Sequence, residues 1–154
     1  MVRLPGYVPS RKKGRKQTVS FDVIKPDGLH AEPGLYTHAF SAPTDGKRLV
    51  IISGQLGIRQ DGSIREPFEG QFHQTYDNLR AVLKAAGGRG LEDLVSLRTF
   101  LSRSELLEEF RALREEHYPK MFPSGEYPPN TLLVVTQLYR PDLWLEIEGI
   151  ALVV

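Results

Sequence analysis

Two carboxylates near the C-terminus are the residues best suited to chemistry in this sequence. Glu146 and Glu148 interrupt residues 145–154, an apolar run typical of a buried strand. Because side chains alternate between the faces of a strand, both carboxylates lie on one face, beside Trp144 and Ile150. A charge on such a strand is costly unless it is paired, bound to a ligand or exposed to water. A solvated or subunit-facing sheet surface is the simpler interpretation, which we favour for Glu148, and the alternative places Glu146 in a cleft as a proton-transfer group.

Other residue types that support catalysis give weaker signals. None of the four histidines lies three to five residues from another, so their spacing predicts no metal site. His38 lies beside Tyr36 in a glycine-bearing segment and is the one histidine considered for a site role, whereas His73 and His117 are expected on helix surfaces. The absence of cysteine excludes disulfides, thiol catalysis and Cys-ligated zinc. No glycine pattern has the spacing of a nucleotide-binding loop or a nucleophile elbow.

Length and composition indicate one globular domain. The chain has 154 residues, of which 40% are hydrophobic and 25% charged, and these values argue against global disorder. A formal net charge of +1 gives no reason to expect a nucleic-acid or membrane-surface protein as a whole. No apolar run approaches the length of about 18 residues that a membrane span requires, and the N-terminus lacks the apolar core of a signal peptide. A cytoplasmic protein is therefore expected.

The first 16 residues differ from the rest. Residues 11–16 carry five basic side chains, and two prolines and two glycines interrupt residues 1–16. The sequence predicts a flexible basic arm over residues 1–16, followed by a single domain over residues 17–154. A contact with a nucleic-acid or phosphate backbone is the alternative to a solvated tail.

The elements that must position Glu146 follow from hydrophobic periodicity. Alternating or continuous apolar runs predict strands at residues 17–24, 39–40, 47–53 and 93–101. Helical periodicity predicts one helix over residues 68–86 and a second that a Ser102–Glu105 capping box opens and Pro119 and Pro123 end. Residues 128–154 are interpreted as a long β-hairpin around a Tyr-Arg-Pro-Asp turn. The prediction is an α+β two-layer domain with a mixed sheet of about six strands and two helices.

Several short motifs occur in an order that resembles a known family. They are Gly34–Ala39, Ile52–Gln55, Asn78–Gly87, Phe100-Leu101, Phe122-Pro123, the Pro-x-x-Thr step at Pro128–Thr131, and Leu145–Ala151. In this order they resemble the RidA/YjgF family, also catalogued as L-PSP endoribonuclease-like, from about Phe21 to the C-terminus. The resemblance implies a chorismate-mutase-like fold that forms a homotrimer, with the sheets packed inward as a central barrel and ligand clefts between subunits. Active members hydrolyse reactive enamines and imines to ammonia and a 2-oxo acid, and they require no cofactor.

The resemblance also assigns roles to individual residues. Glu146 matches the glutamate that positions water or moves a proton, Tyr36 matches the tyrosine lining the cleft, and Gly54 matches the glycine whose backbone faces the substrate. The chain departs from the pattern in Pro128–Thr131, where Asn130 stands before Thr131 in place of the arginine that binds the substrate carboxylate. Loss of a bidentate charged pair is expected to weaken binding by at least ~10-fold.

Other cations could replace this arginine. Arg114, in the second predicted helix, is the first candidate for the substrate anchor, and Arg98 and Arg140 are further candidates.

Three functions follow from these observations. The first is a trimeric RidA-like protein that acts on a small imine, enamine or related metabolite in a cleft between subunits. The second, which Asn130 favours, is a binding or sensor protein that holds a small metabolite in the same cleft without converting it. The third is RNA cleavage, suggested by the older family name and the basic arm, and it is placed last because no general acid–base set for RNA cleavage is visible.

Overall fold

The computed structural model describes residues 22–30 and 38–154. The predicted basic arm over residues 1–16, the domain boundary at residue 17 and the predicted cleft residue Tyr36 lie outside the described residues. The strands are β1 (Asp22–Ile24), β2 (Ala39–Thr44), β3 (Lys47–Leu56), β4 (Leu94–Leu101), β5 (Asn130–Val134) and β6 (Leu145–Val153). The helices are α1 (Phe68–Ala85) and α2 (Leu107–Met121), with short 3-10 turns at Leu91–Asp93 and Ser104–Leu106.

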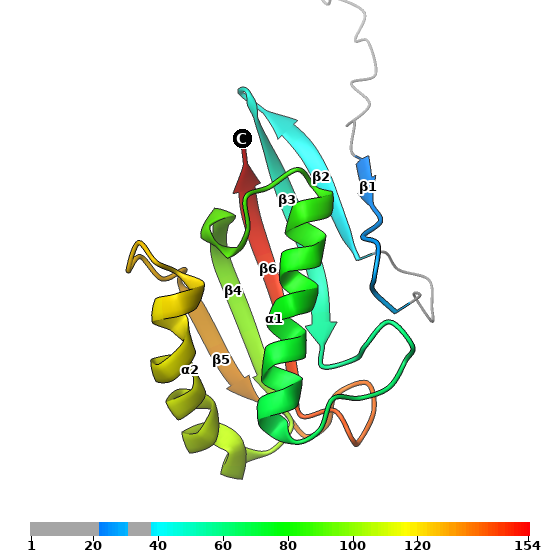
Figure 1. Cartoon of the computed structure of the whole chain (residues 1–154), viewed down its shortest axis with the longest axis vertical. Coiled ribbons are helices and arrows are strands. Elements are labelled where there is room, and N and C mark those ends of the chain that lie inside the picture. The colour runs from blue at the N-terminus through cyan, green and yellow to red at the C-terminus, as the bar shows by residue number, and fades with distance from the viewer. Residues whose placement is uncertain (1–21, 31–37) are drawn as a thin grey trace, which may run out of the picture.

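All six strands form one mixed sheet, and both helices lie on the same face of it (Figure 1). The strand order is β1-β2-β3-β6-β4-β5. Neighbours pair antiparallel, except that β4 and β5 are parallel. The α+β architecture with two helices on a mixed six-stranded sheet is therefore confirmed. In the described part of the chain, no helix is long and apolar enough to cross a membrane.

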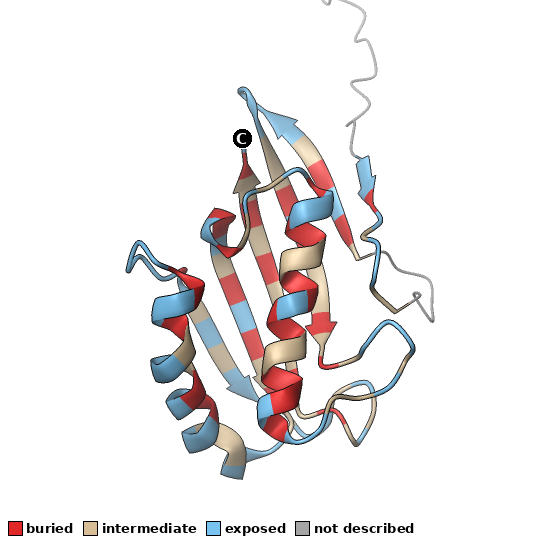
Figure 2. Cartoon of the chain, viewed as in Figure 1, coloured by how far each residue is buried: buried red, intermediate tan, exposed pale blue. Residues whose placement is uncertain are grey.

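The core lies between the helices and the covered face of the sheet (Figure 2). In β6, residues Leu145, Ile147, Gly149, Ala151 and Val153 are buried, and the residues between them are half-buried. This alternation places Glu146 and Glu148 on one face, as the sequence predicts. The stripe of apolar residues predicted for the first helix packs against the sheet, and α1 begins at Phe68 as expected.

The opposite face of the sheet carries exposed apolar side chains. Phe40, Ile51 and Leu133 are 41%, 47% and 43% exposed. Their pairing registers place them on the face that also carries Ile150 and Phe100. Contiguous exposed apolar residues on a sheet are typical of an interaction surface.

The predicted closing hairpin is wrong. Both apolar runs form strands, but β5 pairs with β4 in parallel, and β6 pairs with β3 and with β4. The strand β4 therefore separates β5 from β6, and residues 135–144 form a long connection instead of a tight turn. A β4–α2–β5 crossover explains the parallel pair, because parallel neighbours need a long connection that leaves the sheet and returns. Hydrophobic pattern identifies strands, but it does not determine which strands pair.

The predicted boundaries of the second helix also need correction. Ser102 caps no helix: its hydroxyl donates a hydrogen bond to the Leu143 carbonyl at 2.9 Å. The chain passes through the 3-10 turn Ser104–Leu106 before α2, which has no side-chain cap. Pro119 lies inside α2, which continues to Met121. A proline in the last turn removes one backbone hydrogen bond, and the helix can still run two residues further.

A buried glutamine ties the long connection to α1. Gln71 is fully buried; its amide nitrogen donates to the Asp142 carbonyl and its amide oxygen accepts from the Trp144 N–H, both at 2.9 Å. Replacement of Gln71 with alanine leaves both backbone groups unpaired. Such groups cost about 1–3 kcal/mol when water does not reach them.

We therefore expect Gln71→Ala to lower the free energy of unfolding by about 1–3 kcal/mol, measured by urea denaturation. Lys84→Ala, an exposed change on the same helix, is the matched control and should stay within about 0.5 kcal/mol of the unmodified protein. Equal stability of Gln71→Ala and the control would show that the two hydrogen bonds do not hold the connection.

Candidate functional site

The Glu146 carboxylate lies directly against the backbone of Gly54. The pairing of β3 with β6 shifts register between Ile52 and Gln55, so Ser53 and Gly54 bulge out of the ladder. A Cβ atom built on Gly54 would lie 1.7 Å from Glu146 Oε1 and 2.6 Å from its Cδ. The carboxylate thus occupies the space that any side chain at position 54 would fill. The sequence predicted both residues as site residues, and the structure brings them together.

A cavity of about 420 Å³ opens beside this pair. Its walls include Gly54 and Glu146 from the central strands, Asn78 from α1, Arg140 from the connection before β6, and His38 just before β2. A cavity of this size suits a small metabolite. Of the residues predicted from sequence, Glu146, Gly54 and His38 line it. Arg140 does so as well, although it was a secondary candidate.

Burial raises the pKa of Glu146, and the nearby Glu148 carboxylate adds to the effect. Glu148 has a different environment, because Arg98 Nη1 lies 2.6 Å from its Oε1. Among the described residues, Glu146 has no hydrogen-bond or ion-pair partner. A carboxylate without a partner and partly removed from water holds its proton more tightly, and its anion is a stronger base.

His38 contributes a defined tautomer to the cavity wall. Its Nε2 lies 3.1 Å from the His30 carbonyl oxygen. A carbonyl can only accept, so Nε2 carries the proton and donates this hydrogen bond.

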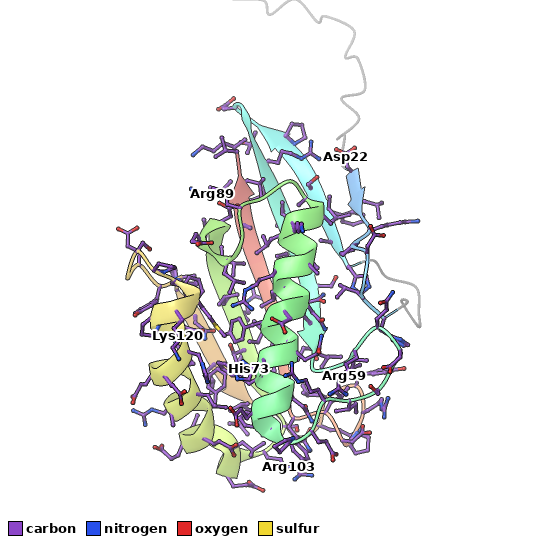
Figure 3. The ribbon with its side chains drawn as sticks, in the orientation of Figure 1. Asp22, Arg59, His73, Arg89, Arg103 and Lys120 are labelled. Carbon is purple, nitrogen blue, oxygen red and sulfur yellow. The ribbon has the colours of Figure 1, made fainter. Side chains whose placement is uncertain are left out.

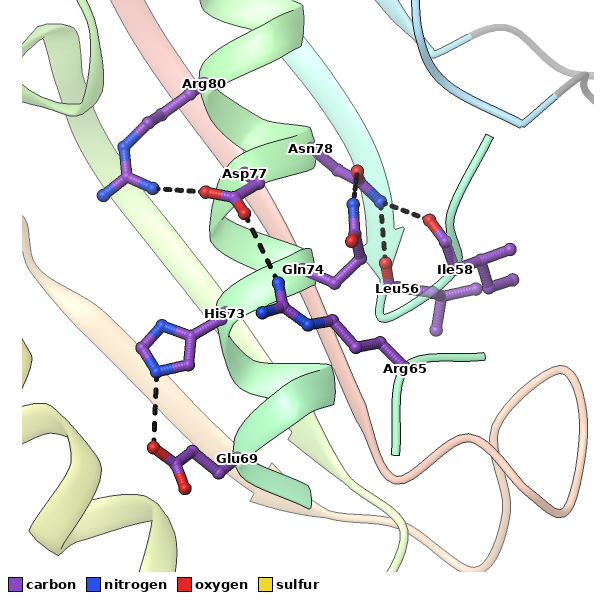
Figure 4. Close-up of polar contacts among 9 residues, drawn as sticks. All are labelled: Leu56, Ile58, Arg65, Glu69, His73, Gln74, Asp77, Asn78 and Arg80. Carbon is purple, nitrogen blue, oxygen red and sulfur yellow. Dashed lines mark hydrogen bonds and ion pairs between the residues drawn. The ribbon is translucent and has the colours of Figure 1, made fainter. Parts of the chain in front are cut away.

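Asn78 fixes the end of β3 at the edge of the cavity. Its amide nitrogen donates to the carbonyls of Leu56 at 2.8 Å and Ile58 at 3.0 Å, and its amide oxygen accepts from Gln74 (Figure 4). Asn78 appeared in the sequence only as part of a family motif. Its role could not be found by pattern, because both carbonyl partners lie about twenty residues earlier in the chain.

Arg140 is held in the cavity wall by a nearby carboxylate. Its Nε donates to Asp142 Oδ1 at 3.0 Å, and its Nη2 lies 2.5 Å from Oδ2. The hydrogen bond with Arg140 lowers the pKa of Asp142, so this acid stays ionised. Both side chains are 43% exposed, and a ligand anion could compete with Asp142 for the guanidinium.

Three residues predicted to bind substrate lie outside the lining of the Glu146 cavity. Asn130 accepts a hydrogen bond from the Thr99 hydroxyl at 3.1 Å, on the helix-covered side of β5. Thr131 is exposed on the opposite face. Arg114 lies 4.5 Å above the Tyr118 ring and lines a second cavity of about 410 Å³. None of these three residues lines the Glu146 cavity of the same chain.

The fold also joins two histidines that are 44 positions apart. His73 and His117 have ring centroids 4.5 Å apart between α1 and α2, and both side chains are at least half-buried. The sequence placed both on helix surfaces. Spacing along the chain says nothing about residues that two packed helices bring together.

Gly54→Ala should displace the Glu146 carboxylate, because the new Cβ would overlap it. Overpacking of this kind costs about 1–3 kcal/mol of unfolding free energy. In a Glu146→Ala background the carboxylate no longer occupies this space, so Gly54→Ala should lower the free energy of unfolding clearly less. A double-mutant cycle by urea denaturation measures the difference, and additive effects would contradict the close contact.

Glu146→Gln tests the raised pKa through stability. The folded protein binds this proton more tightly than the unfolded chain, so Glu146 favours folding below its ordinary pKa of 4.5. That contribution is lost as pH rises through the raised pKa. Glutamine does not ionise, and Glu146→Gln should melt at a higher temperature than the unmodified protein at about pH 8, with the gap closing towards about pH 4. Glu148→Gln, which loses the Arg98 pair, should show no such gain.

Comparison with known proteins places this chain in a family. The family model described as Endoribonuclease L-PSP matches residues 32–153. The RutC family protein YjgH of Escherichia coli K12 is 32% identical over 127 residues, which cover 81% of this chain and 91% of that protein.

Solved structures support the fold. The Rid-family protein YyfA of Yersinia pestis, described as of unknown function, is 25% identical, with a TM-score of 0.72 over 86% of this chain and 98% of that one. Escherichia coli TdcF, solved with bound serine, is 22% identical, with a TM-score of 0.72 over 84% of this chain and 97% of that one. The match over most of the chain and the identity to YjgH show that this protein belongs to the Endoribonuclease L-PSP family, the RidA/YjgF family that its sequence motifs resemble.

Proposed function

We propose that the Glu146 cavity binds a small imine or enamine and hydrolyses it to a carbonyl compound and ammonia. Glu146 takes a proton from water as the oxygen adds to the C=N carbon, and the proton passes to the nitrogen. As the carbinolamine collapses, its hydroxyl proton passes to the nitrogen, the C–N bond breaks, the C=O group forms and ammonia leaves. An enamine first gains a proton on carbon to become the imine. No cofactor takes part in these steps.

One observation carries the proposal: the Glu146 carboxylate projects beside the Gly54 backbone into a cavity of small-metabolite size, without a recorded partner among the described residues. An ion pair would stabilise the carboxylate as an anion and reduce its basicity. Desolvation has the opposite effect and raises the pKa of Glu146 towards the working pH of a general base. Glu148, neutralised by Arg98, does not meet this requirement.

We further propose that Arg140 takes the place of the missing arginine as the anchor for an anionic substrate. It lines the same cavity as Glu146, whereas Arg114 does not. The serine bound in the similar TdcF structure is a small molecule with a carboxylate, and its size suits the cavity here.

In a homotrimer, Arg114 could still bind the substrate from a neighbouring subunit. The exposed apolar face of the sheet supports assembly with other copies through that face. We propose that the cleft in such a trimer lies between subunits and that Arg114 of one subunit contributes to the Glu146 cavity of the next. Asn130 and Thr131 would belong to that shared cleft.

The second candidate is a protein that binds the metabolite without converting it. Asn130 and the pairing of Arg140 with Asp142 favour this version, because both reduce the positive charge available to orient a carboxylate. A ligand should then raise the melting temperature and be recovered unchanged. RNA cleavage ranks last, and its test is loss of salt-sensitive RNA binding on deletion of residues 1–16.

Ammonia release from freshly generated imines tests the enzyme. Glu146→Gln should reduce kcat by about 100-fold or more, the range of general acid–base catalysis. Arg140→Ala should raise KM by about 10-fold for imines that carry a carboxylate and leave neutral imines unaffected. Arg114→Ala tests the other candidate anchor for the carboxylate in the same assay. Arg80→Ala is the control, because this arginine lies outside both cavity linings.

Heat-denatured protein sets the uncatalysed rate. A rate for the unmodified protein no higher than this one would reject hydrolysis. A ligand-induced rise in melting temperature under the same conditions would then support the binding protein.

A further inference from the structure

A cluster of metal-ligating side chains lies between α1 and α2, on the helix side of the sheet. It consists of Glu69 and His73 from α1 and His117 from α2, and one oxygen and two nitrogens, one from each residue, lie within 4.8 Å of one another. Side chains fill the space between the two helices at this level (Figure 3). None of the three residues lines the Glu146 cavity.

The two α1 residues are placed for joint binding by helical geometry. Positions i and i+4 share one face of a helix, so Glu69 and His73 project together towards the side on which α2 lies (Figure 4). Glu69 Oε1 is 3.6 Å from His73 Nε2, which is too long for a hydrogen bond. The contact therefore leaves both atoms available to a shared third partner.

The third residue completes the set from the neighbouring helix. The ring of His117 meets that of His73 edge to face, at 77°. His117 Nε2 is buried and makes no hydrogen bond within the described residues, and the Glu116 carboxylate lies 3.7 Å away. A buried imidazole nitrogen without a partner is a destabilising feature that a metal ion would remove.

We propose that Glu69, His73 and His117 bind Zn²⁺ or a similar first-row divalent cation. Two imidazoles and one carboxylate suit Zn²⁺ among such ions, and water would fill the fourth tetrahedral position. Bonds of about 2.0–2.1 Å require ligand atoms roughly 3.3 Å apart, so the cluster must contract. The Glu69 side chain is 56% exposed and can rotate to do so.

The ion would act as a clamp between the helices. Within the described chain, the buried hydroxyls of Tyr76 and Tyr118, 2.7 Å apart, join the same two helices one turn further along α1. A metal at the Glu69 cluster adds a second link, nearer the start of α1. The site shares no residue with the proposed imine site, and failure of either proposal leaves the other untouched.

Calorimetric titration of chelator-treated protein with Zn²⁺ at about pH 7.5 tests the site. We expect one ion per chain, a higher melting temperature with Zn²⁺, and the visible absorption of tetrahedral Co²⁺ when Co²⁺ replaces it. His73→Gln and His117→Gln should each weaken Zn²⁺ binding by at least about 10-fold, and Glu69→Gln should weaken it as well.

His30→Gln is the matched control, because His30 lies in the other cavity wall and should leave Zn²⁺ affinity unchanged. Circular dichroism without metal shows whether each variant is folded, and a variant that is unfolded is replaced by the corresponding asparagine. Wild-type affinity in folded His73 and His117 variants, or no Zn²⁺ binding by the unmodified protein, would overturn the proposal. An equal loss in His30→Gln would do the same, since binding would then not be specific to this cluster.

Discussion

The position of β6 between β3 and β4 determines the surroundings of both of its carboxylates. β6 pairs with a neighbouring strand along both of its edges, so its position in the sheet is fixed from two sides. It carries Glu146 and Glu148. Gly54 in β3 lies against Glu146, and Arg98 in β4 forms an ion pair with Glu148. A shift of one residue in register would turn both carboxylates into the core. The hydrophobic residues on the covered face therefore fix the site as firmly as they fix the fold.

Glu146 and Glu148 show how two identical side chains, two positions apart, acquire different chemistry. Glu148 is ion-paired with Arg98, whose Nη1 lies 2.6 Å from its Oε1. Glu146 has the bare backbone of a bulged glycine and the wall of a cavity, and both burial and the neighbouring charge favour its neutral form. The difference comes from the two neighbouring strands, and the composition of β6 alone does not reveal it. Glu146 is a candidate base because its neighbours in the described part of the chain provide no charged or hydrogen-bonding partner.

Periodicity was sufficient to locate β3, β4, β6 and α1, because burial on one face places apolar residues at every second position of a strand or every third to fourth position of a helix. It underestimated β2, predicted at residues 39–40 and observed over Ala39–Thr44. It could not reveal that β5 joins the sheet beside β4, since the apolar pattern of an edge strand resembles that of a hairpin partner. The prediction that Ser102 caps a helix was wrong because its hydroxyl donates a hydrogen bond to the Leu143 carbonyl, 41 residues away in the chain. Motif order identified Glu146 and Gly54. Arg140, Asn78 and the His73–His117 contact depend on distant parts of the chain meeting, which local patterns do not record.

The connection between β5 and β6 has a consequence for how such a protein can diversify. It brings Arg140 and Tyr139 to the cavity, and Gln71 anchors its end from α1. Residues in this segment lie outside the strand ladders, so substitutions there alter recognition without disturbing sheet register. The carboxylate, by contrast, sits on a central strand where few changes are tolerated. Under the proposed function, substitutions in this single segment would change which ligand binds while Glu146, the proposed proton-transfer group, stays in place.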